Sequence, residues 1–186
     1  MSESRGTGEV QGGEVTVRFL YAKQGISRFI SSRYMAVVLE RALRRIGFPL
    51  VFTQGFHPRP RMRFGPSLPV GIAGSNEFFD LRAAGRVDPA AAVEAANRCL
   101  PPGLRMVSCR VLPPDGDRYP TGLKGRYRIE RTASLDEAAL ARTGRIVESS
   151  EHFVTIEVVL DRFNHTALLN AAGGALIERV LVYDKE

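Results

Sequence analysis

Residues 15–47 have the sequence VTVRFLYAKQGISRFISSRYMAVVLERALRRIG, in which a strand pattern is followed by a helix pattern. Apolar residues alternate with Thr16 and Arg18 over residues 15–21, which predicts a strand with one buried face. Ser31 and Ser32 can then cap a helix that Gly47 ends. Apolar residues recur in this helix at three- and four-residue spacing, at Met35, Val38, Leu39, Ala42, Leu43 and Ile46.

The segments that follow complete a β-α-β-β-α-β order over residues 14–113. Extended pieces are expected at residues 50–53 and 61–64, and a strand at residues 77–82. Asp88 then caps a second helix that begins with Pro89, and Pro101, Pro102 and Gly103 end it before a strand over residues 105–112. This order is that of the split βαβ or ferredoxin-like arrangement.

The same order repeats on a smaller scale after a Pro-, Gly- and Asp-rich linker at residues 114–124. Strands are expected at residues 126–131, 145–148, 153–160 and 175–183, and helices from a capping box at Ser134 and Glu137 to about residue 141 and over residues 164–172. We therefore predict an α+β protein of tandem ferredoxin-like domains, residues 14–113 and a smaller domain at 125–186, after a disordered leader at 1–13. A single irregular α+β domain is the structural alternative.

Composition favours a basic intracellular protein. The 186 residues include 26 Lys and Arg against 20 Asp and Glu, a formal net charge of +6, which favours polyanionic partners. The two cysteines, Cys99 and Cys109, lack C-x-x-C spacing and are expected to stay unpaired in a reducing compartment. The sequence shows no secretion signal and no apolar run of membrane-spanning length, so we predict a cytoplasmic protein without a membrane partner.

The strongest charge asymmetry lies between Glu40 and Glu77, where the chain has six arginines and no acidic residue. Arginine donates two parallel hydrogen bonds to a phosphate, and an adjacent aromatic ring can stack on a base. The segment QGFHPRPRMRF, residues 54–64, combines both kinds of side chain. An alternative for the helix arginines is that they complement its C-terminal dipole. The predicted nucleic-acid-binding residues are Arg28, Arg45, Gln54, Phe56, His57, Arg59, Arg61 and Arg63.

The sequence lacks the motifs of self-sufficient cofactor enzymes. Its three histidines, His57, His152 and His165, are widely separated and do not form a metal-ligand pattern. It contains no iron–sulfur, phosphate-loop or nucleophile-elbow motif, so we expect no metal and no cofactor. One enzymatic hypothesis needs neither, namely RNA cleavage with His57 as general base or acid and arginines stabilising the phosphorane.

Residues 15–115 resemble the radical-SAM-linked protein family, a bacterial domain of unknown function found fused to, or encoded beside, cobalamin-binding radical SAM proteins. The motifs that carry the resemblance are ERALRR at residues 40–45, QGF-x-P-x-P-R at 54–61 and LPVG at 68–71. The chain departs from the family pattern at Ser32, where a His is common, near Tyr34, where an acidic residue is common, and at His57 and Arg59, where Asn and His are frequent. The resemblance implies an auxiliary role beside a radical SAM protein that performs the iron–sulfur chemistry.

These observations lead to a principal hypothesis and two alternatives. The principal one is a non-catalytic accessory module that binds RNA, or an RNA-containing substrate, through the basic Gly/Pro/Arg loop and presents it to a radical SAM partner. The first alternative is a protein-interaction module whose basic face docks on the radical SAM enzyme. The second is a metal-independent endoribonuclease that uses His57.

Overall fold

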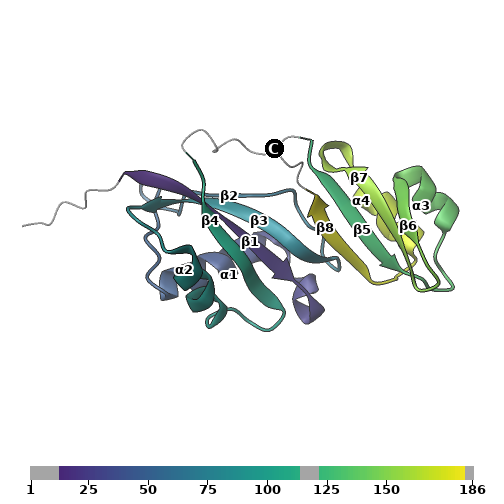
Figure 1. Cartoon of the computed structure of the whole chain (residues 1–186), viewed down its shortest axis with the longest axis horizontal. Helices are drawn as coiled ribbons and strands as arrows, with labels where there is room; N and C mark the ends of the chain where they lie inside the picture. Colours follow the sequence, from purple (N-terminus) through teal and green to yellow (C-terminus); the bar gives the residue numbers. More distant parts are fainter. Residues whose placement is uncertain (1–12, 114–121, 183–186) are drawn as a thin grey trace, which may run out of the picture.

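The computed structural model describes residues 13–113 and 122–182 and shows a mixed α/β protein with one sheet and four α-helices in these residues (Figure 1). The strands lie in the order β4-β1-β3-β8-β5-β7-β6. Strand β2 pairs with residues 79–81 of β3, on the edge of β3 that does not pair with β1. The elements are β1 Glu14–Lys23, the 3-10 helix η1 Gly25–Phe29, α1 Ser32–Arg45, β2 Met62–Phe64, β3 Ala73–Ala84, α2 Pro89–Asn97, β4 Leu104–Val111, β5 Lys124–Glu130, α3 Glu137–Thr143, β6 Arg145–Ser149, β7 Phe153–Val159, the 3-10 helix η2 Leu160–Arg162, α4 His165–Ala172 and β8 Ile177–Val182.

The first strand and helix form as the sequence predicts. The Ser31 side chain accepts a hydrogen bond from the Tyr34 backbone N–H at the start of α1, and Gly47 takes a left-handed conformation with φ of 68° just after its end. The apolar stripe of α1 packs on β1 and β3, where the rings of Phe19 and Phe79 stack with centroids 5.3 Å apart. This packing forms the core of the N-terminal half.

Truncation of Leu39 or Leu43 to Ala is expected to lower the free energy of unfolding by about 2 to 5 kcal/mol, because each substitution leaves a cavity in this core. Both leucines are fully buried in the middle of the α1 stripe. Urea denaturation of the two variants measures the effect. A midpoint equal to that of the wild type in both would contradict the placement of the stripe.

A single short pairing joins the two halves of the sheet. The N-terminal half has the order β4-β1-β3 with β2 beside β3, and the C-terminal half has the order β8-β5-β7-β6. Strand β8 runs parallel to β3, and Ala73 and Gly74 pair there with Glu178 and Arg179. The strands therefore form one continuous sheet. One apolar cluster lies in the N-terminal half, and the other fills the C-terminal half and also includes Leu68, Ile72 and Phe78 of the N-terminal half. The predicted linker lies mostly at residues 114–121, outside the described residues, as does the predicted leader except for Gly13.

The structure corrects three predicted local features. Strand β3 begins at Ala73, four residues before the predicted start, and residues 50–53 contribute only bridges to Ala83 and Pro60. The N-cap of α3 is Asp136, whose carboxylate accepts from the Ala139 N–H, and not Ser134. Ser134 instead donates its hydroxyl to the Gly173 carbonyl, because it lies against the end of α4. Tertiary contact thus overrides the local capping pattern.

Cys99 and Cys109 are both free and half-buried in the structure. Burial raises the pKa of the Cys109 thiol to about 12, so this thiol is not activated for nucleophilic chemistry. In the part of the chain that the structure describes, no helix is long and apolar enough to cross a membrane.

Candidate nucleic-acid interface

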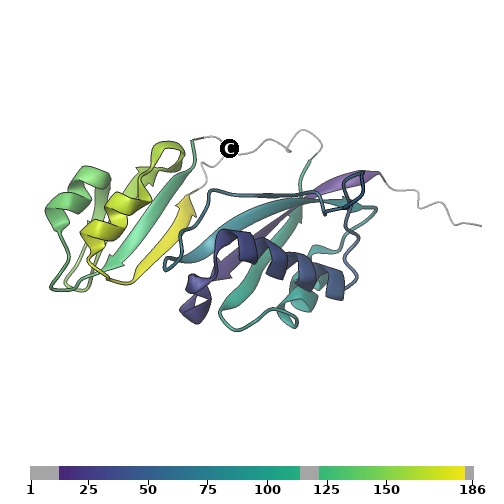
Figure 2. The ribbon, with the colours of Figure 1, turned by 180° about the vertical axis from the view of Figure 1, so that it is seen from behind.

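The sheet of the N-terminal half has one face covered by α1, as Figure 2 shows. Because side chains alternate along a strand, Val17 and Phe19 face this helix and their neighbours point to the opposite side. That opposite side is viewed in Figure 1. We call it the arginine face, defined by the side chains of Arg18, Arg61, Arg63, Arg82 and Arg110.

The strand register aligns these arginines in rows. Arg18 of β1 lies opposite Arg110 of β4 on one side and Asp80 of β3 on the other. Arg63 of β2 lies opposite the same Asp80, so one row of three arginines and one aspartate crosses four strands. Directly opposed side chains lie close enough to act as a unit.

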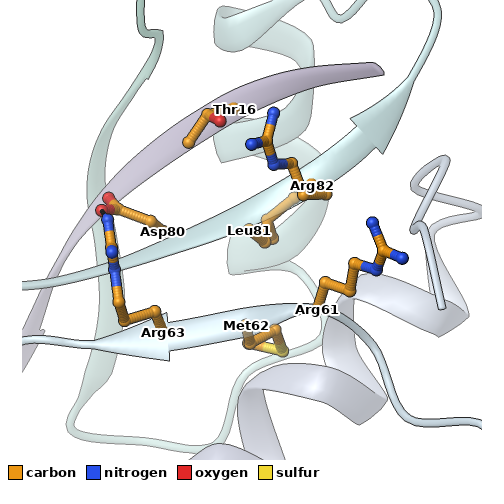
Figure 3. Close-up of a pocket in the computed structure, with 7 residues that line it drawn as sticks. All are labelled: Thr16, Arg61, Met62, Arg63, Asp80, Leu81 and Arg82. Carbon is orange, nitrogen blue, oxygen red and sulfur yellow. Dashed lines mark ion pairs between the residues drawn. The ribbon is translucent and has the colours of Figure 1, made fainter. Parts of the chain in front are cut away.

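A second row contains Thr16 and Arg82, which pair directly, and Arg61, whose carbonyl accepts from the Arg82 N–H. A shallow pocket opens between the two rows (Figure 3). Arg63 of β2, Arg82 of β3 and Arg61, which directly precedes β2, therefore share one depression in the protein surface. Its lining residues are Thr16, Arg61, Met62, Arg63, Asp80, Leu81 and Arg82.

Two carboxylates neutralise part of this charge. Asp80 is buried and accepts hydrogen bonds of 2.6 and 2.8 Å from Arg18, and its second oxygen lies 3.5 Å from an Arg63 nitrogen. Glu14 lies 3.4 Å from Arg61. Among the residues that the structure describes, these five arginines and two carboxylates sum to a formal charge of +3. The side chains of Arg61 and Arg63 are 45% and 46% exposed, so their guanidinium groups remain accessible to an anionic ligand.

The structure separates the predicted binding residues into four places. Arg61 and Arg63 lie on the arginine face. The adjoining loop at residues 53–59 is closed by a 2.8 Å hydrogen bond from the Thr53 N–H to the Arg59 carbonyl. Its four predicted residues are all exposed, and they are Gln54, Phe56, His57 and Arg59.

Arg45 and Arg28 lie away from the arginine face. Arg45 is exposed in the last turn of α1, where its charge complements the helix dipole. Arg28 belongs to η1, at the junction of the two halves. The sequence prediction omitted Arg18, Arg82 and Arg110. Alternation along a strand shows on which face of that strand each side chain lies, but only the register between strands shows that all three lie on the same face of the sheet.

A buried network of polar side chains lies next to the pairing of β3 with β8 and joins the two halves of the sheet. Arg179 is fully buried and donates hydrogen bonds of 2.9 and 2.6 Å to the two carboxylate oxygens of Glu77. It also donates to the backbone carbonyls of Pro66 and Ser67. Burial opposes the charge of Arg179, but the adjacent Glu77 outweighs this effect and raises the pKa of the guanidinium. The guanidinium of Arg179 therefore stays charged.

The network continues through Tyr127 to α4. The Tyr127 hydroxyl lies 3.4 Å from an Arg179 nitrogen and 2.7 Å from Nε2 of His165. Burial, with a smaller contribution from the positive charge of Arg179, lowers the pKa of His165 to about 4. The imidazole is therefore neutral at pH 7.

This shift predicts a loss of stability in acid. The unfolded chain protonates His165 near its ordinary pKa of 6.5, whereas the folded protein does so near 4, so stability that is present above pH 6.5 is lost as the pH falls through this window. We expect the free energy of unfolding to fall by about 1 to 2 kcal/mol. This is less than the whole pKa shift would give, because the ring is only half-buried. Urea denaturation from pH 7 to pH 4 measures it. His165→Gln should show a flatter profile, and equal slopes for the two proteins would contradict the assignment.

A family model described as an uncharacterized protein conserved in bacteria (DUF2344) matches residues 16–160. The chain belongs to this family. The match contains every residue of the arginine face and the loop at residues 53–59, whereas His165 and Arg179 lie beyond it. A comparison with curated proteins found no match.

The described residues contain no group of three or more His, Cys, Asp or Glu side chains that is placed to hold a metal ion. His57 is exposed in the loop beside the arginine face. The geometry of this region therefore consists of accessible cationic groups next to one exposed aromatic ring and one imidazole, an arrangement suited to binding a polyanion.

Proposed function

We propose that this protein binds single-stranded RNA, or an RNA-containing substrate, on its arginine face. The observation that carries the proposal is the grouping of Arg61, Arg63, Arg82 and Arg110 on one face of the sheet, around the Arg18–Asp80 pair, which is itself buried. Guanidinium groups at this density favour a ligand with repeated phosphates, because each contact releases a condensed counterion.

Two features favour a single strand over a duplex. The described part of this face is formed by strands, and a sheet face with aromatic side chains is a common platform for single-stranded RNA. At its edge, Phe56 is fully exposed at the tip of the loop, where its ring is free to stack on an unpaired base. Arginines on a sheet beside an exposed aromatic ring suit an extended RNA strand. Its phosphates contact the arginines of the sheet, and one of its bases stacks on the ring in the loop.

The accessory role and its radical SAM partner rest on the sequence resemblance of residues 15–115 and remain part of the proposal. In this account the protein holds the RNA while a radical SAM enzyme modifies it. We also infer that each half is a ferredoxin-like unit, which the strand orders β4-β1-β3-β2 and β8-β5-β7-β6 support.

Photocrosslinking tests where RNA binds. Single-stranded RNA containing 4-thiouridine is irradiated with the full chain, and crosslinked peptides are located by mass spectrometry. We expect crosslinks in β1, β2, β3 and residues 53–59, and intact RNA in a parallel incubation. Crosslinks concentrated on α2 and α3, or none at physiological salt, would contradict the proposal, and cleavage lost in His57→Ala would favour the ribonuclease alternative.

Substitution of Phe56 by Ala is expected to weaken RNA binding by about 1 to 3 kcal/mol, since base stacking on the ring is lost. Folding should not change, because the side chain is fully exposed. The salt dependence of binding should also stay the same, because no charge is removed. Fluorescence anisotropy at several salt concentrations measures both quantities, and wild-type affinity in the variant would exclude a stacking role for this ring.

A further inference from the structure

A second exposed surface lies at η1, away from the arginine face. Four large apolar side chains project there, with Ile26 exposed by 75%, Phe29 by 52%, Tyr34 by 53% and Val70 by 51%. Single exposed apolar residues are ordinary on a protein surface, whereas a contiguous group marks an interaction site. We call these four residues the apolar patch.

Local structure holds the members of the apolar patch together. Ile26 and Phe29 are three residues apart in η1, and side chains at this spacing eclipse one another in a 3-10 helix. The Gly71 N–H donates a 2.9 Å hydrogen bond to the Arg28 carbonyl, which brings Val70 beside η1. The Ser32 and Ser67 hydroxyls lie 3.0 Å apart and fix the same loop to the start of α1, near Tyr34.

A groove borders the apolar patch where the two halves meet. Figure 1 shows η1 as the purple coil beyond the end of β1, on the side of the C-terminal half. Arg28 of η1 lines this groove together with Leu176, which is half-exposed, and Phe153, whose ring lies 3.8 Å beneath the Arg128 guanidinium. The groove therefore offers apolar walls with an arginine on each side.

The charge around the apolar patch has one dominant sign. Residues 15–39 contain no Asp or Glu, and Arg28 and Arg33 flank the exposed apolar side chains. In the groove, Glu178 already accepts hydrogen bonds from Ser75 and Gln24. Glu130 is the second acid of the groove and lies on the side of the C-terminal half, beyond η1. The groove itself is balanced, because Arg28 and Arg128 face Glu130 and Glu178, so the rim of the apolar patch with Arg28 and Arg33 is the part that complements a ligand that is both apolar and acidic.

We propose that the apolar patch and the adjoining groove dock an acidic, amphipathic segment of a partner protein. Its apolar side chains cover Ile26, Phe29 and Val70 and enter the groove beside Leu176, and its carboxylates face Arg28 and Arg33. A second copy of this chain fits less well, because a symmetric contact brings the same arginines against each other. RNA lacks aliphatic side chains to cover the patch. This inference is independent of RNA binding on the arginine face.

Selection from a displayed peptide library tests the proposal. Random 20-residue peptides are selected on the full chain and counter-selected on the Ile26→Ser/Phe29→Ser variant, and the affinities of synthetic winners are measured by fluorescence anisotropy. We expect winners with apolar residues at helical spacing and an excess of Asp and Glu. The double variant should bind them at least about tenfold more weakly, because central apolar anchors carry most of an interface's binding energy.

The matched control is Leu169→Ser/Val159→Ser, which removes two exposed apolar side chains from the C-terminal half and should leave peptide affinity unchanged. Circular dichroism verifies that both variants fold. Arg28→Glu/Arg33→Glu should weaken the same peptides and reduce the salt dependence of association. The proposal is overturned by neutral or basic winners, by equal binding to the Ile26/Phe29 variant, or by a concentration-dependent dimer in ultracentrifugation that this variant abolishes.

Discussion

Replacement of Arg179 by Met is expected to lower the free energy of unfolding by about 3 to 5 kcal/mol, because it leaves the Glu77 carboxylate buried without its partner. Glu77 is 1% exposed, so water cannot replace the guanidinium. The carbonyls of Pro66 and Ser67 lose their donors in the same substitution. Removal of one partner from a buried pair is among the most destabilising single changes in a protein.

Urea denaturation with a matched control measures this effect. Arg126→Met breaks an exposed pair with Glu157 in the same sheet, and it should change stability by less than about 1 kcal/mol. The double variant Glu77→Leu/Arg179→Met should be less destabilised than Arg179→Met alone, because it also removes the uncompensated buried carboxylate. An equal loss of unfolding free energy in Arg126→Met and Arg179→Met would show that the buried pair does not stabilise the junction of the two halves.

Much of the local structure could be predicted from the sequence, because it depends on neighbours along the chain. The predicted caps at Ser31 and Asp88 both form, since each side chain bonds to N–H groups two or three residues away. Ser134 failed as a cap because its hydroxyl bonds to Gly173, 39 residues later. A contact between residues so far apart in the chain produces no pattern in the sequence around either residue.

The arrangement of the candidate interface could be predicted only in part. The acid-free stretch identified Arg61 and Arg63, which the structure places side by side on the arginine face. Arg18 and Arg110 belong to it because β1 pairs with both β3 and β4, and no local pattern specifies that register. The bond between Arg179 and Glu77 spans 102 residues and depends on the parallel pairing of β3 with β8.

The double variant Arg61→Gln/Arg63→Gln is expected to weaken binding of single-stranded RNA at least about tenfold, since two charge-assisted hydrogen bonds to phosphates are lost. The loss should be similar for RNAs of different sequence, because phosphate contacts position the strand without reading bases. The matched control is Arg98→Gln/Arg142→Gln. It removes the same net charge from exposed positions at the ends of α2 and α3.

The salt dependence of RNA affinity tests the central claim most directly. The logarithm of the binding constant is measured against the logarithm of salt concentration for the wild type and both double variants. Each phosphate contact contributes a slope of about 0.7 for a single strand, so the Arg61/Arg63 variant should be flatter by about 1.4, whereas Arg98/Arg142 should keep the wild-type slope. Identical slopes and affinities in all three proteins, or no binding by the wild type at physiological salt, would contradict RNA binding on the arginine face.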